Sequence, residues 1–536
     1  MTASSPADHL SHGLDLLQEG NTVHAQDAFR SGLAAADALG GAALAKEVVE
    51  LHFRLANLAT NAGDLGLAET HYKQALRIDL TLVAAWCNLG NVLQQRGKIT
   101  EALPYYDQAL KHDPTHLATR LNVVRALLAN ENWGLARQFV TALIADHPAL
   151  AEAHALAGRI EAGLQHYEAA QTAFERAVGL APSDPESLYW LASMRQELGD
   201  EPGALAAYTE AQRLRPFIRQ DAIKSPPDFT VLALQAPFGG NTPTEYLFFA
   251  PDYAVNTYAV LPGATHDIAR LRSAGDLVVN LVSDADQAAD ILPDVVALTT
   301  QLDKPLVNPP GEILKTTRDG TVAALSGRPN VLVPGSVRIP AGEATDPATL
   351  ATRIPGRLPV LARPAGTHGG DDFELCDTLE ALSAFLGRHP DADHYLIDYI
   401  DYQSADGHFR KYRFIFIEGE ILPYHLAIGD TWKVHHVNTD MINQHWMQEE
   451  EARFLADPAS CFSPASFDGL RAVASAFDLS YFGIDCGLTR DGDLVVFEVN
   501  ASMLVHQHNE DMPYKTPHVA RIKVAFDRML TRKVMS

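Results

Sequence analysis

The sequence predicts a multidomain protein in which an all-α solenoid of helical repeats is followed by an α/β region. Three observations lead to this prediction: a 34-residue period in the first part of the chain, apolar β-type runs after residue 228, and an Asp-Gly turn near residue 491. At 536 residues the chain is too long for one core, because domains typically hold about 100–200 residues.

Composition limits the classes of partner. The formal net charge is −25, from 67 acidic and 42 basic residues, so we expect no nucleic-acid binding, although a local basic pocket remains compatible with this charge. The first twenty residues lack the pattern of a signal peptide, and no apolar stretch is long enough to span a bilayer, so we expect no membrane association. The four cysteines, which are Cys87, Cys376, Cys461 and Cys486, have no metal-ligand spacing and suit a reducing cytoplasm.

The repeats are visible as four registers, each with a period of 34 residues. The members are Pro114, Pro148, Pro182 and Pro216; Ala68, Ala102, Ala136, Ala170 and Ala204; Tyr72, Tyr106, Phe174 and Tyr208, with Val140 in the gap; and Ala75, Ala109, Ala177 and Ala211, interrupted by Leu143. Small residues let two helices approach closely, and the aromatic residue fills the space between neighbouring pairs. Proline ends the second helix because it cannot continue the hydrogen-bond ladder.

This array resembles the tetratricopeptide family. One repeat carries the full pattern, namely Trp86, Leu89, Gly90, Ala102, Tyr106, Ala109 and Pro114. An earlier copy around Gly13, Ala25 and Phe29 has a longer predicted second helix, which gives about six repeats over residues 8–216. The resemblance implies a concave groove that binds a peptide or protein. The alternative is an array that serves only self-association, and a homo-oligomer is therefore left open.

The α/β region follows a predicted linker at residues 217–228, which contains Lys224-Ser-Pro-Pro. The apolar β-type runs are Phe229–Leu234, Leu247–Ala250, Leu277–Val282 and Leu306–Val307. They alternate with helical stretches such as Ala285–Leu298, as expected for an α/β fold.

A predicted hairpin near the C-terminus brings acids together. Asp491-Gly492 favours a two-residue type I′ turn, in which Arg490 pairs with Asp493. Counting outward, Asp485 lies opposite Glu498, and Asn500 shares the face of Glu498 because side chains alternate along a strand. The other face is a predicted core side, made of Ile484, Cys486, Leu488, Val495, Phe497 and Val499.

Two interpretations of these acids remain open from the hairpin alone. Like charges directly opposite each other destabilise a sheet, so a hard cation such as Mg²⁺, which prefers oxygen ligands, is a natural partner. The alternative is a hairpin that faces solvent and whose acids are merely hydrated.

The pattern Asp485 … Glu498-Val499-Asn500 resembles the metal signature of ATP-grasp enzymes. Glutathione synthetase and RimK-type ligases are the most similar members, and D-alanine–D-alanine ligase is more distant. The resemblance implies that Glu498 bridges two Mg²⁺ ions and that Asp485 and Asn500 each hold one. It also implies a pre-ATP-grasp domain at 229–310 and an ATP-grasp domain of two lobes at 311–525.

The resemblance extends to a nucleotide site for ATP. Leu358–Gly370 reads as a strand that runs into a Gly-rich loop, and such loops let backbone N–H groups approach phosphates. The implied phosphate contacts are Arg363, which stands where the family has Lys, the loop residues His368, Gly369 and Gly370, and Arg318, with Lys315 as its alternative. Tyr395–Ile400 resembles the strand that holds the adenine, so Asp398, Tyr399, Ile400 and Asp401 are expected to contact the base or sugar.

The residues implied in catalysis are Lys411, Arg413 and Lys433. Phe409–Ile417 alternates like a strand, with Lys411 and Arg413 on one face and Tyr412 and Phe414 on the other. RimK-type enzymes have an Arg at the position of Arg413, where it contacts phosphate and the acyl group; the alternative is a solvated strand face. Lys433 and His436 belong to the segment His425–His436, expected over the acceptor site, and His506 and His508 are candidates for the pocket wall. No Cys or acid has convincing spacing for zinc.

The expected activity is that of an ATP- and Mg²⁺-dependent carboxylate–amine ligase that forms C–N bonds through an acyl-phosphate. We expect a peptide or protein substrate on the repeats, a small carboxylate or amine as co-substrate, and a role in peptide modification. Two alternatives remain: a phosphotransferase (kinase) on the same fold, and a repeat-protein scaffold whose ATP-grasp domain is catalytically degenerate.

Overall fold

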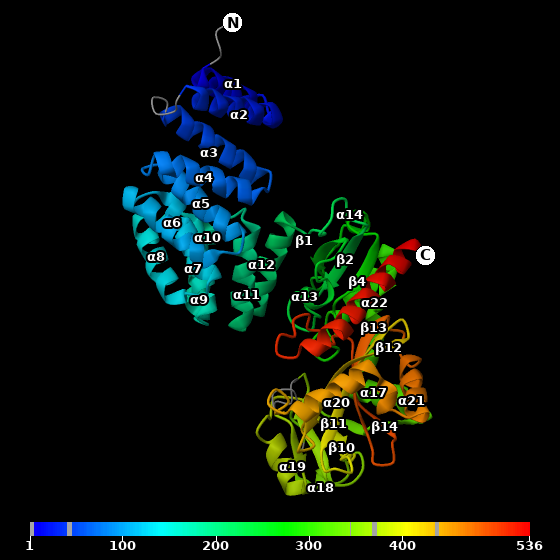
Figure 1. The fold of residues 1–536 in the computed structure, drawn as a ribbon. Coiled ribbons are helices and arrows are strands. Elements are labelled where there is room, and N and C mark those ends of the chain that lie inside the picture. The colour runs from blue at the N-terminus through cyan, green and yellow to red at the C-terminus, as the bar shows by residue number, and fades with distance from the viewer. Residues whose placement is uncertain (1–4, 40–44, 344, 367–371, 435–438) are drawn as a thin grey trace. The chain divides into compact units, whose positions relative to one another are not determined.

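The computed structural model describes residues 5–39, 45–343, 345–366, 372–434 and 439–536. The chain divides into two compact units, Met1–Leu214 and Arg215–Ser536, drawn in blue to teal and in green to red in Figure 1. Within the described segments, none of the helices combines the length and the apolar composition that crossing a bilayer requires.

The described part of the first unit consists of twelve helices. They are α1 Pro6–Gln18, α2 Thr22–Ala38, α3 Ala45–Asn61, α4 Leu65–Ile78, α5 Val83–Gln95, α6 Ile99–His112, α7 Leu117–Ala129, α8 Trp133–Asp146, α9 Ala151–Gly163, α10 Tyr167–Leu180, α11 Pro185–Glu197 and α12 Glu201–Leu214. Each odd-numbered helix packs against the even-numbered helix that follows it. As predicted, the second helix of the earliest pair is longer, with 17 residues in α2 against 14 in α4.

The small residues of the period do pack between helices. The five alanines of the longest register, from Ala68 to Ala204, are all 0% exposed. Gly90 and Gly158 permit close approaches, because a Cβ atom there would lie 2.4 Å from the ring of Tyr106 and 2.7 Å from that of Phe174. The predicted reason for the repeat pattern is therefore confirmed at these positions.

The second unit begins with a five-stranded sheet of order β1-β3-β2-β4-β5. Its elements are β1 Ile218–Gln220, β2 Thr230–Gln235, α13 Thr244–Leu247, β3 Ala254–Ala259, α14 Ile268–Ser273, β4 Leu277–Asn280, α15 Leu292–Leu302 and β5 Leu306–Val307. Strands β2 to β5 run parallel, and β1 is antiparallel to β3. Strand β1 lies within residues 217–228, the segment interpreted as a linker.

Two expectations for this sheet were wrong. Leu247–Ala250 is not a strand, because α13 ends at Leu247 and Ala250 has a positive φ of 43°. Its apolar side chains are nevertheless buried at Leu247 and Phe248, and a short buried run has no periodicity that separates strand from helix. The helix expected from Ala285 begins at Leu292 instead.

A four-stranded antiparallel sheet follows, with order β7-β10-β8-β9. Its elements are β7 Ser336–Ile339, α18 Pro347–Leu350, β8 Val360–Pro364, β9 Glu374–Cys376, α19 Leu379–Leu386 and β10 His394–Asp398. It has a small core of its own that includes Ile339, Val360 and Phe385.

The third sheet has order β12-β11-β13-β14-β6 and carries the largest hydrophobic core. Its strands are β6 Val331–Leu332, β11 Phe409–Ile417, β12 Glu420–Gly429, β13 Tyr481–Leu488 and β14 Leu494–Asn500. The helices of this part of the chain are α16 Pro310–Ile313, η2 Leu314–Thr316, α17 Arg318–Leu325, α20 His445–Ala456, η4 Pro458–Ser460, α21 Pro464–Ala474, η5 Pro513–Lys515 and α22 Thr516–Met535. The predicted strand Phe409–Ile417 is confirmed with the same bounds as β11.

The predicted pairing of Asp485 with Glu498 is confirmed, but the predicted turn is wrong. Thr489 and Asp493 close a three-residue loop, with the N–H of Thr489 3.0 Å from the oxygen of Asp493. Of the two turn residues, only Gly492 has a positive φ, 88°, so the type I′ turn does not form. The longer loop shifts the register by one residue, and a bulge between Asp485 and Cys486 shifts it back.

The bulge also changes the position of Phe497. We expected this side chain on the core face, opposite the acids. Instead it lines the same cavity as Glu498 and packs 4.8 Å from the ring of Tyr402. An extra residue on one strand of a bulged pair breaks the strict alternation on which that expectation depended. Ile484, Cys486 and Val499 are buried in the core as expected.

Candidate functional site

The second unit holds a cavity of about 530 Å³ that receives residues from the second and third sheets and from the loops after β2 and β4 of the first sheet. Most of the predicted site residues line it, namely Arg318, Arg363, Asp398, Tyr399, Ile400, Lys411, Arg413, Lys433, Asp485, Glu498 and Asn500. Asp401 is not among the described lining residues, and its carboxylate caps the N–H of Gln403 at 2.9 Å. His368, Gly369, Gly370 and His436 lie outside the described residues.

Asp485 is the most buried acid of the cavity, with a side chain that is 8% exposed. The guanidinium group of Arg413 donates to both its oxygens, at 2.6 Å from Nε and 3.0 Å from Nη2, and Nζ of Lys411 lies 3.0 Å from Oδ2. Burial alone would raise the pKa of Asp485, but these two cations outweigh it and hold the pKa well below its usual range. Asp485 is therefore ionised at neutral pH.

Glu498 lies opposite Asp485 and has its own cation. Nη2 of Arg318 is 3.1 Å from its Oε2, and the amide of Asn500 donates to its Oε1 at 3.2 Å. The oxygen of Asn500 accepts from the N–H and hydroxyl of Ser502, at 2.7 and 2.6 Å. Burial and Asp485 oppose ionisation of Glu498, but Arg318 outweighs them and lowers its pKa.

The register of the third sheet explains why these groups meet. Arg413 pairs with Asp485 across β11 and β13, and Asp485 pairs with Glu498 across β13 and β14. Directly opposed residues point to the same face, so a basic residue and two acids form one row. Tyr412 and Phe414 point into the core as predicted.

The charge of the cavity differs from that of the chain. Its described lining carries five basic and four acidic side chains, whereas the whole chain has a net charge of −25. The basic ones are Arg318, Arg363, Lys411, Arg413 and Lys433, and the acidic ones are Asp284, Asp398, Asp485 and Glu498. A locally basic cavity in an acidic protein suits an anionic ligand.

Asp398 occupies a narrow space that two glycines leave free. A Cβ atom at Gly335 would lie 2.5 Å from its Oδ2, and one at Gly356 would lie 2.5 Å from its Oδ1. Burial raises the pKa of this carboxyl group. The position of Asp398 in the cavity therefore depends on both glycines.

Sequence reasoning missed an aromatic wall of the cavity. The rings of Phe373 and Trp432 meet edge to face at 5.3 Å, and the guanidinium group of Arg363 lies 5.4 Å from the ring of Phe373. Nζ of Lys433 donates to the carbonyl oxygen of Phe373 at 3.2 Å. Trp432 could have been found from the sequence, because it is adjacent to the candidate residue Lys433. No sequence pattern marks Phe373 as a cavity residue.

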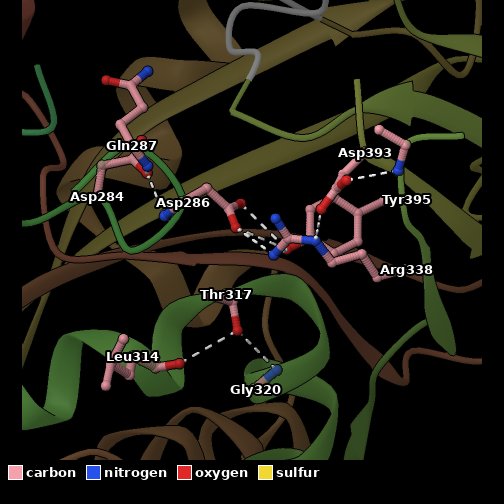
Figure 2. Close-up of polar contacts among 10 residues, drawn as sticks. Asp284, Asp286, Gln287, Leu314, Thr317, Gly320, Arg338, Asp393 and Tyr395 are labelled. Carbon is pink, nitrogen blue, oxygen red and sulfur yellow. Dashed lines mark hydrogen bonds and ion pairs between the residues drawn. The ribbon is translucent and has the colours of Figure 1, made fainter. Parts of the chain in front are cut away.

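A second missed feature joins the loop after β4 to the four-stranded sheet (Figure 2). Both oxygens of Asp286 accept from the hydroxyl of Tyr395, at 3.0 and 3.2 Å, and Nη1 of Arg338 is 3.1 Å from Oδ1. Nε of Arg338 also donates to Asp393 at 2.9 Å. Asp286 and Tyr395 line a smaller cavity of about 60 Å³ that also receives Glu498. These contacts thus hold the loop after β4 close to Glu498.

The start of α17 explains the position of Arg318. The hydroxyl of Thr317 accepts the N–H of Gly320 at 3.1 Å and donates to the carbonyl of Leu314, so it caps the helix (Figure 2). Arg318 is then the first helical residue and reaches Glu498. Lys315, the alternative candidate, pairs with Glu312 at 2.6 Å and is not among the described lining residues.

Comparison with known proteins identifies the repeats. Models of the tetratricopeptide repeat match residues 49–81, 83–116 and 155–217, so the first unit contains tetratricopeptide repeats. No curated protein matches the chain.

Solved structures that resemble part of the chain include the following three proteins. MamA from Desulfovibrio magneticus is 23% identical with a TM-score of 0.30, and the match covers 31% of this chain and 94% of the MamA chain. A tetratricopeptide repeat protein from Parabacteroides merdae is 17% identical with a TM-score of 0.34, covering 38% and 77%. PilF from Pseudomonas aeruginosa is 18% identical with a TM-score of 0.34, covering 39% and 92%.

Proposed function

We propose that the chain is an ATP- and Mg²⁺-dependent ligase of the ATP-grasp type, which joins a carboxylate to an amine through an acyl-phosphate. One observation carries this proposal: the opposed acids Asp485 and Glu498 lie in a cavity of about 530 Å³ that is otherwise rich in basic groups. Acids that bind a hard cation, surrounded by cations that bind phosphate, suit a nucleotide–metal complex.

The donor set fits magnesium. Both carboxylates are ionised at neutral pH, and Mg²⁺ typically takes one or two carboxylates and completes its shell with water and phosphate oxygens. A carboxylate offers about four acceptor positions, and the contacts described above use three on Asp485 and two on Glu498. When bound, the ion supplies positive charge that neutralises phosphate oxygens. Asp485 and Glu498 would hold it, and Asn500 would join them once its oxygen exchanges one of its two hydrogen bonds from Ser502 for the ion.

The nucleotide has a place in the rest of the cavity. Arg318 and Arg363 supply charge for its phosphates, and Arg grips phosphate bidentately, which makes it an adequate replacement for the family's Lys. Tyr399 and Ile400 offer backbone groups to the base, and the rings of Phe373 and Trp432 supply an apolar wall. Asp398, which directly precedes Tyr399 in the cavity lining, is the acid that we assign to the sugar.

Lys411, Arg413 and Lys433 would stabilise the reacting groups. The carboxylate of the substrate attacks the γ-phosphorus of ATP, ADP leaves, and an amine then displaces phosphate from the acyl-phosphate. Negative charge develops on the phosphoryl oxygens and then on the acyl oxygen, and fixed cations lower the free energy of both transition states. Arg413 and Lys411 both contact Asp485, so these two are better placed than Lys433.

The tetratricopeptide repeats suggest that one substrate is a peptide or protein. Tethering raises its effective concentration at a catalytic domain on the same chain. Peptide modification would suit such a combination.

The test is a screen of acid–amine pairs for release of ADP, with peptides among both classes. Hydroxylamine is then added in place of the amine, because it traps an acyl-phosphate as a hydroxamate. A ligase gives ADP and hydroxamate. A phosphotransferase that acts on a hydroxyl group gives a stable phosphorylated product and no hydroxamate, and a scaffold gives no turnover of ATP.

A further inference from the structure

The second sheet belongs to a lobe that has its own hydrophobic core. This lobe consists of the described residues from Ser336 to Asp398, and its core cluster includes Ile339, Val360 and Phe385. The first and third sheets instead share two larger clusters, and among the described residues neither of these takes a buried side chain from the lobe. The lobe can therefore separate from the rest of the unit without exposing a shared core.

A carboxylate on the loop after β4 receives two donors from this lobe (Figure 2). The hydroxyl of Tyr395 donates to both oxygens of Asp286, at 3.0 and 3.2 Å, and Nη1 of Arg338 lies 3.1 Å from Oδ1. Burial, together with Asp286, raises the pKa of Tyr395, so the hydroxyl keeps the proton that it donates. The side chain of Asp286 is 17% exposed, so water competes only partly for its oxygens.

The loop side of this contact is fixed to the first sheet. The N–H groups of Asp286 and Gln287 donate to Oδ1 of Asp284, at 2.9 and 3.0 Å. The N–H of Asp284 donates in turn to the carbonyl oxygen of Gly240, in the loop after β2, at 3.0 Å. Asp286 is thus held in place by its own loop, and the lobe is the body that moves when the contact breaks.

The lobe side of the contact carries Arg363 into the cavity. Tyr395 is directly opposed to Arg338 on β7 and to Arg363 on β8, so the three side chains lie on one face of the second sheet. Arg363 is buried and lines both cavities, and the smaller of these also receives Asp286 and Glu498. Movement of the lobe away from Asp286 therefore withdraws Arg363 from the neighbourhood of Glu498.

A second set of contacts joins the lobe to the segment after β12. The ring of Phe373 meets that of Trp432 at 5.3 Å, and its carbonyl oxygen accepts from Nζ of Lys433 at 3.2 Å. This oxygen is neutral, whereas Asp286 is a carboxylate paired with Arg338. Because charge on both partners strengthens a hydrogen bond, we expect the contacts of Asp286 to contribute more to the closed position.

We propose that Asp286 is a latch that holds the lobe closed over the cavity, and that release of Tyr395 and Arg338 lets the lobe open for exchange of the ligand. The closed lobe places Arg363 near Glu498, and the open lobe uncovers the cavity. Asp286 thus acts on the ligand through Arg363 and is a positioning residue. Only the identity of that ligand, a nucleotide with Mg²⁺, rests on the proposed function.

The first test measures opening without any ligand. Spin labels are attached at Thr352→Cys in the lobe and Val524→Cys on α22, which are exposed positions, and Cys461→Ser removes the cysteine that is not buried. Pulsed electron paramagnetic resonance then gives the distribution of distances, and we expect one main, short distance in wild type. Asp286→Ala should raise the ratio of open to closed protein about tenfold or more, as expected for loss of a hydrogen bond to a charged group.

Two further variants show whether Asp286 acts through the phenol. Tyr395→Phe removes only the hydroxyl and should also raise the ratio. Because both substitutions break the same hydrogen bond, Asp286→Ala combined with Tyr395→Phe should match Asp286→Ala within about twofold. Asp290→Ala is the matched control, since Asp290 is an exposed acid of the same loop, and it should leave the ratio unchanged.

Three results of the distance measurement would overturn the latch. They are an unchanged ratio in Asp286→Ala, effects of the two substitutions that multiply in the double variant, and a wild-type distribution dominated by the longer distance. If Asp286→Ala does not fold, Tyr395→Phe carries the test alone, and an unchanged ratio in that variant overturns the latch.

Hydrogen exchange separates opening of the lobe from local unfolding. Because the lobe has its own core, backbone amides of the β8–β10 ladder should exchange in Asp286→Ala as they do in wild type. Faster exchange of these amides would show that the lobe unfolds instead of opening as one body, and this result would also overturn the latch.

The second test adds Mg²⁺ and a non-hydrolysable ATP analogue. The analogue should dissociate about tenfold faster from Asp286→Ala than from wild type or Asp290→Ala, because it leaves through the open form. Equal dissociation rates despite a raised ratio of open protein would overturn the role of the lobe in ligand exchange. Wild-type protein that binds no analogue contradicts the proposed function, whereas an unchanged distance ratio in Asp286→Ala contradicts the latch whether or not the analogue binds.

Discussion

Arg318 contacts Glu498 through a 3.1 Å ion pair between Nη2 and Oε2, so the first residue of α17 is joined to β14, the strand that carries Glu498. The side chain of Glu498 is more accessible than that of Asp485, with exposed fractions of 30% and 8%. The proposed cation would therefore meet Glu498 first.

Glu498→Gln tests the proposed metal site. The substitution keeps the size of the side chain and removes the charge, so a divalent cation and the phosphates it neutralises should bind less well. We expect Mg²⁺-dependent ATP turnover to fall about 100-fold or more, because such ions contribute several kcal/mol of charge stabilisation. Glu420→Gln is the control, since Glu420 pairs with Arg521 and Arg528 and is not among the described lining residues. Equal turnover in wild type and Glu498→Gln would exclude the site.

Gly356→Ala tests the position of Asp398. The new methyl group would lie 2.5 Å from Oδ1, and Gly335 confines the carboxylate from the other side, so Asp398 must move. Displacing a group that positions a ligand by about 1 Å can lower the reaction rate about 100-fold. We expect weaker binding of a non-hydrolysable ATP analogue with Mg²⁺, measured by titration calorimetry. Gly311→Ala adds a methyl group with nothing within 4 Å and should bind as wild type does. Unchanged affinity in Gly356→Ala would remove Asp398 from the nucleotide site.

The sequence allowed some of these relationships to be predicted and concealed others. Asp485 and Glu498 could be paired by counting from the Asp-Gly turn, although the count succeeded only because a bulge cancels the extra loop residue. Periodicity also placed Lys411 and Arg413 on one face. Contacts such as that of His425 with Glu451 join a strand to a helix 26 residues later, and no local pattern encodes the angle at which that helix crosses the sheet.

Arg413→Met tests the buried ion pair. Asp485 would keep only Lys411 as a partner while remaining 8% exposed, and breaking a buried pair by removing one member costs about 3–5 kcal/mol. We expect backbone amides of β13 to exchange hydrogen at least about 100-fold faster than in wild type. Arg521→Met removes a partner at the surface, where the side chain is 62% exposed, and should leave the exchange of β13 nearly unchanged.

The second substitution Asp485→Asn, added to Arg413→Met, removes the uncompensated charge. It should recover much of the lost protection of β13. If the double variant exchanges as fast as Arg413→Met alone, the loss came from packing of the Arg413 side chain and the ion pair is not its cause.

Two histidines, His52 of α3 and His71 of α4, are in contact in the repeats. Nδ1 of His52 lies 2.9 Å from Nδ1 of His71, and burial together with His71 lowers the pKa of His52 to about 4, although Asp37 opposes this. The unfolded chain binds this proton with a pKa near 6.5, so stability is fully present above that pH and is lost as the pH falls through about 4. Between pH 7 and pH 5, protection factors of amides in residues 45–78 should fall about tenfold or more in the full chain. His52→Gln cannot take up the proton and should remove most of this pH dependence, whereas His24→Gln, at an exposed position, should retain it. A His52→Gln protein that loses protection as steeply as wild type would show that another group causes the effect.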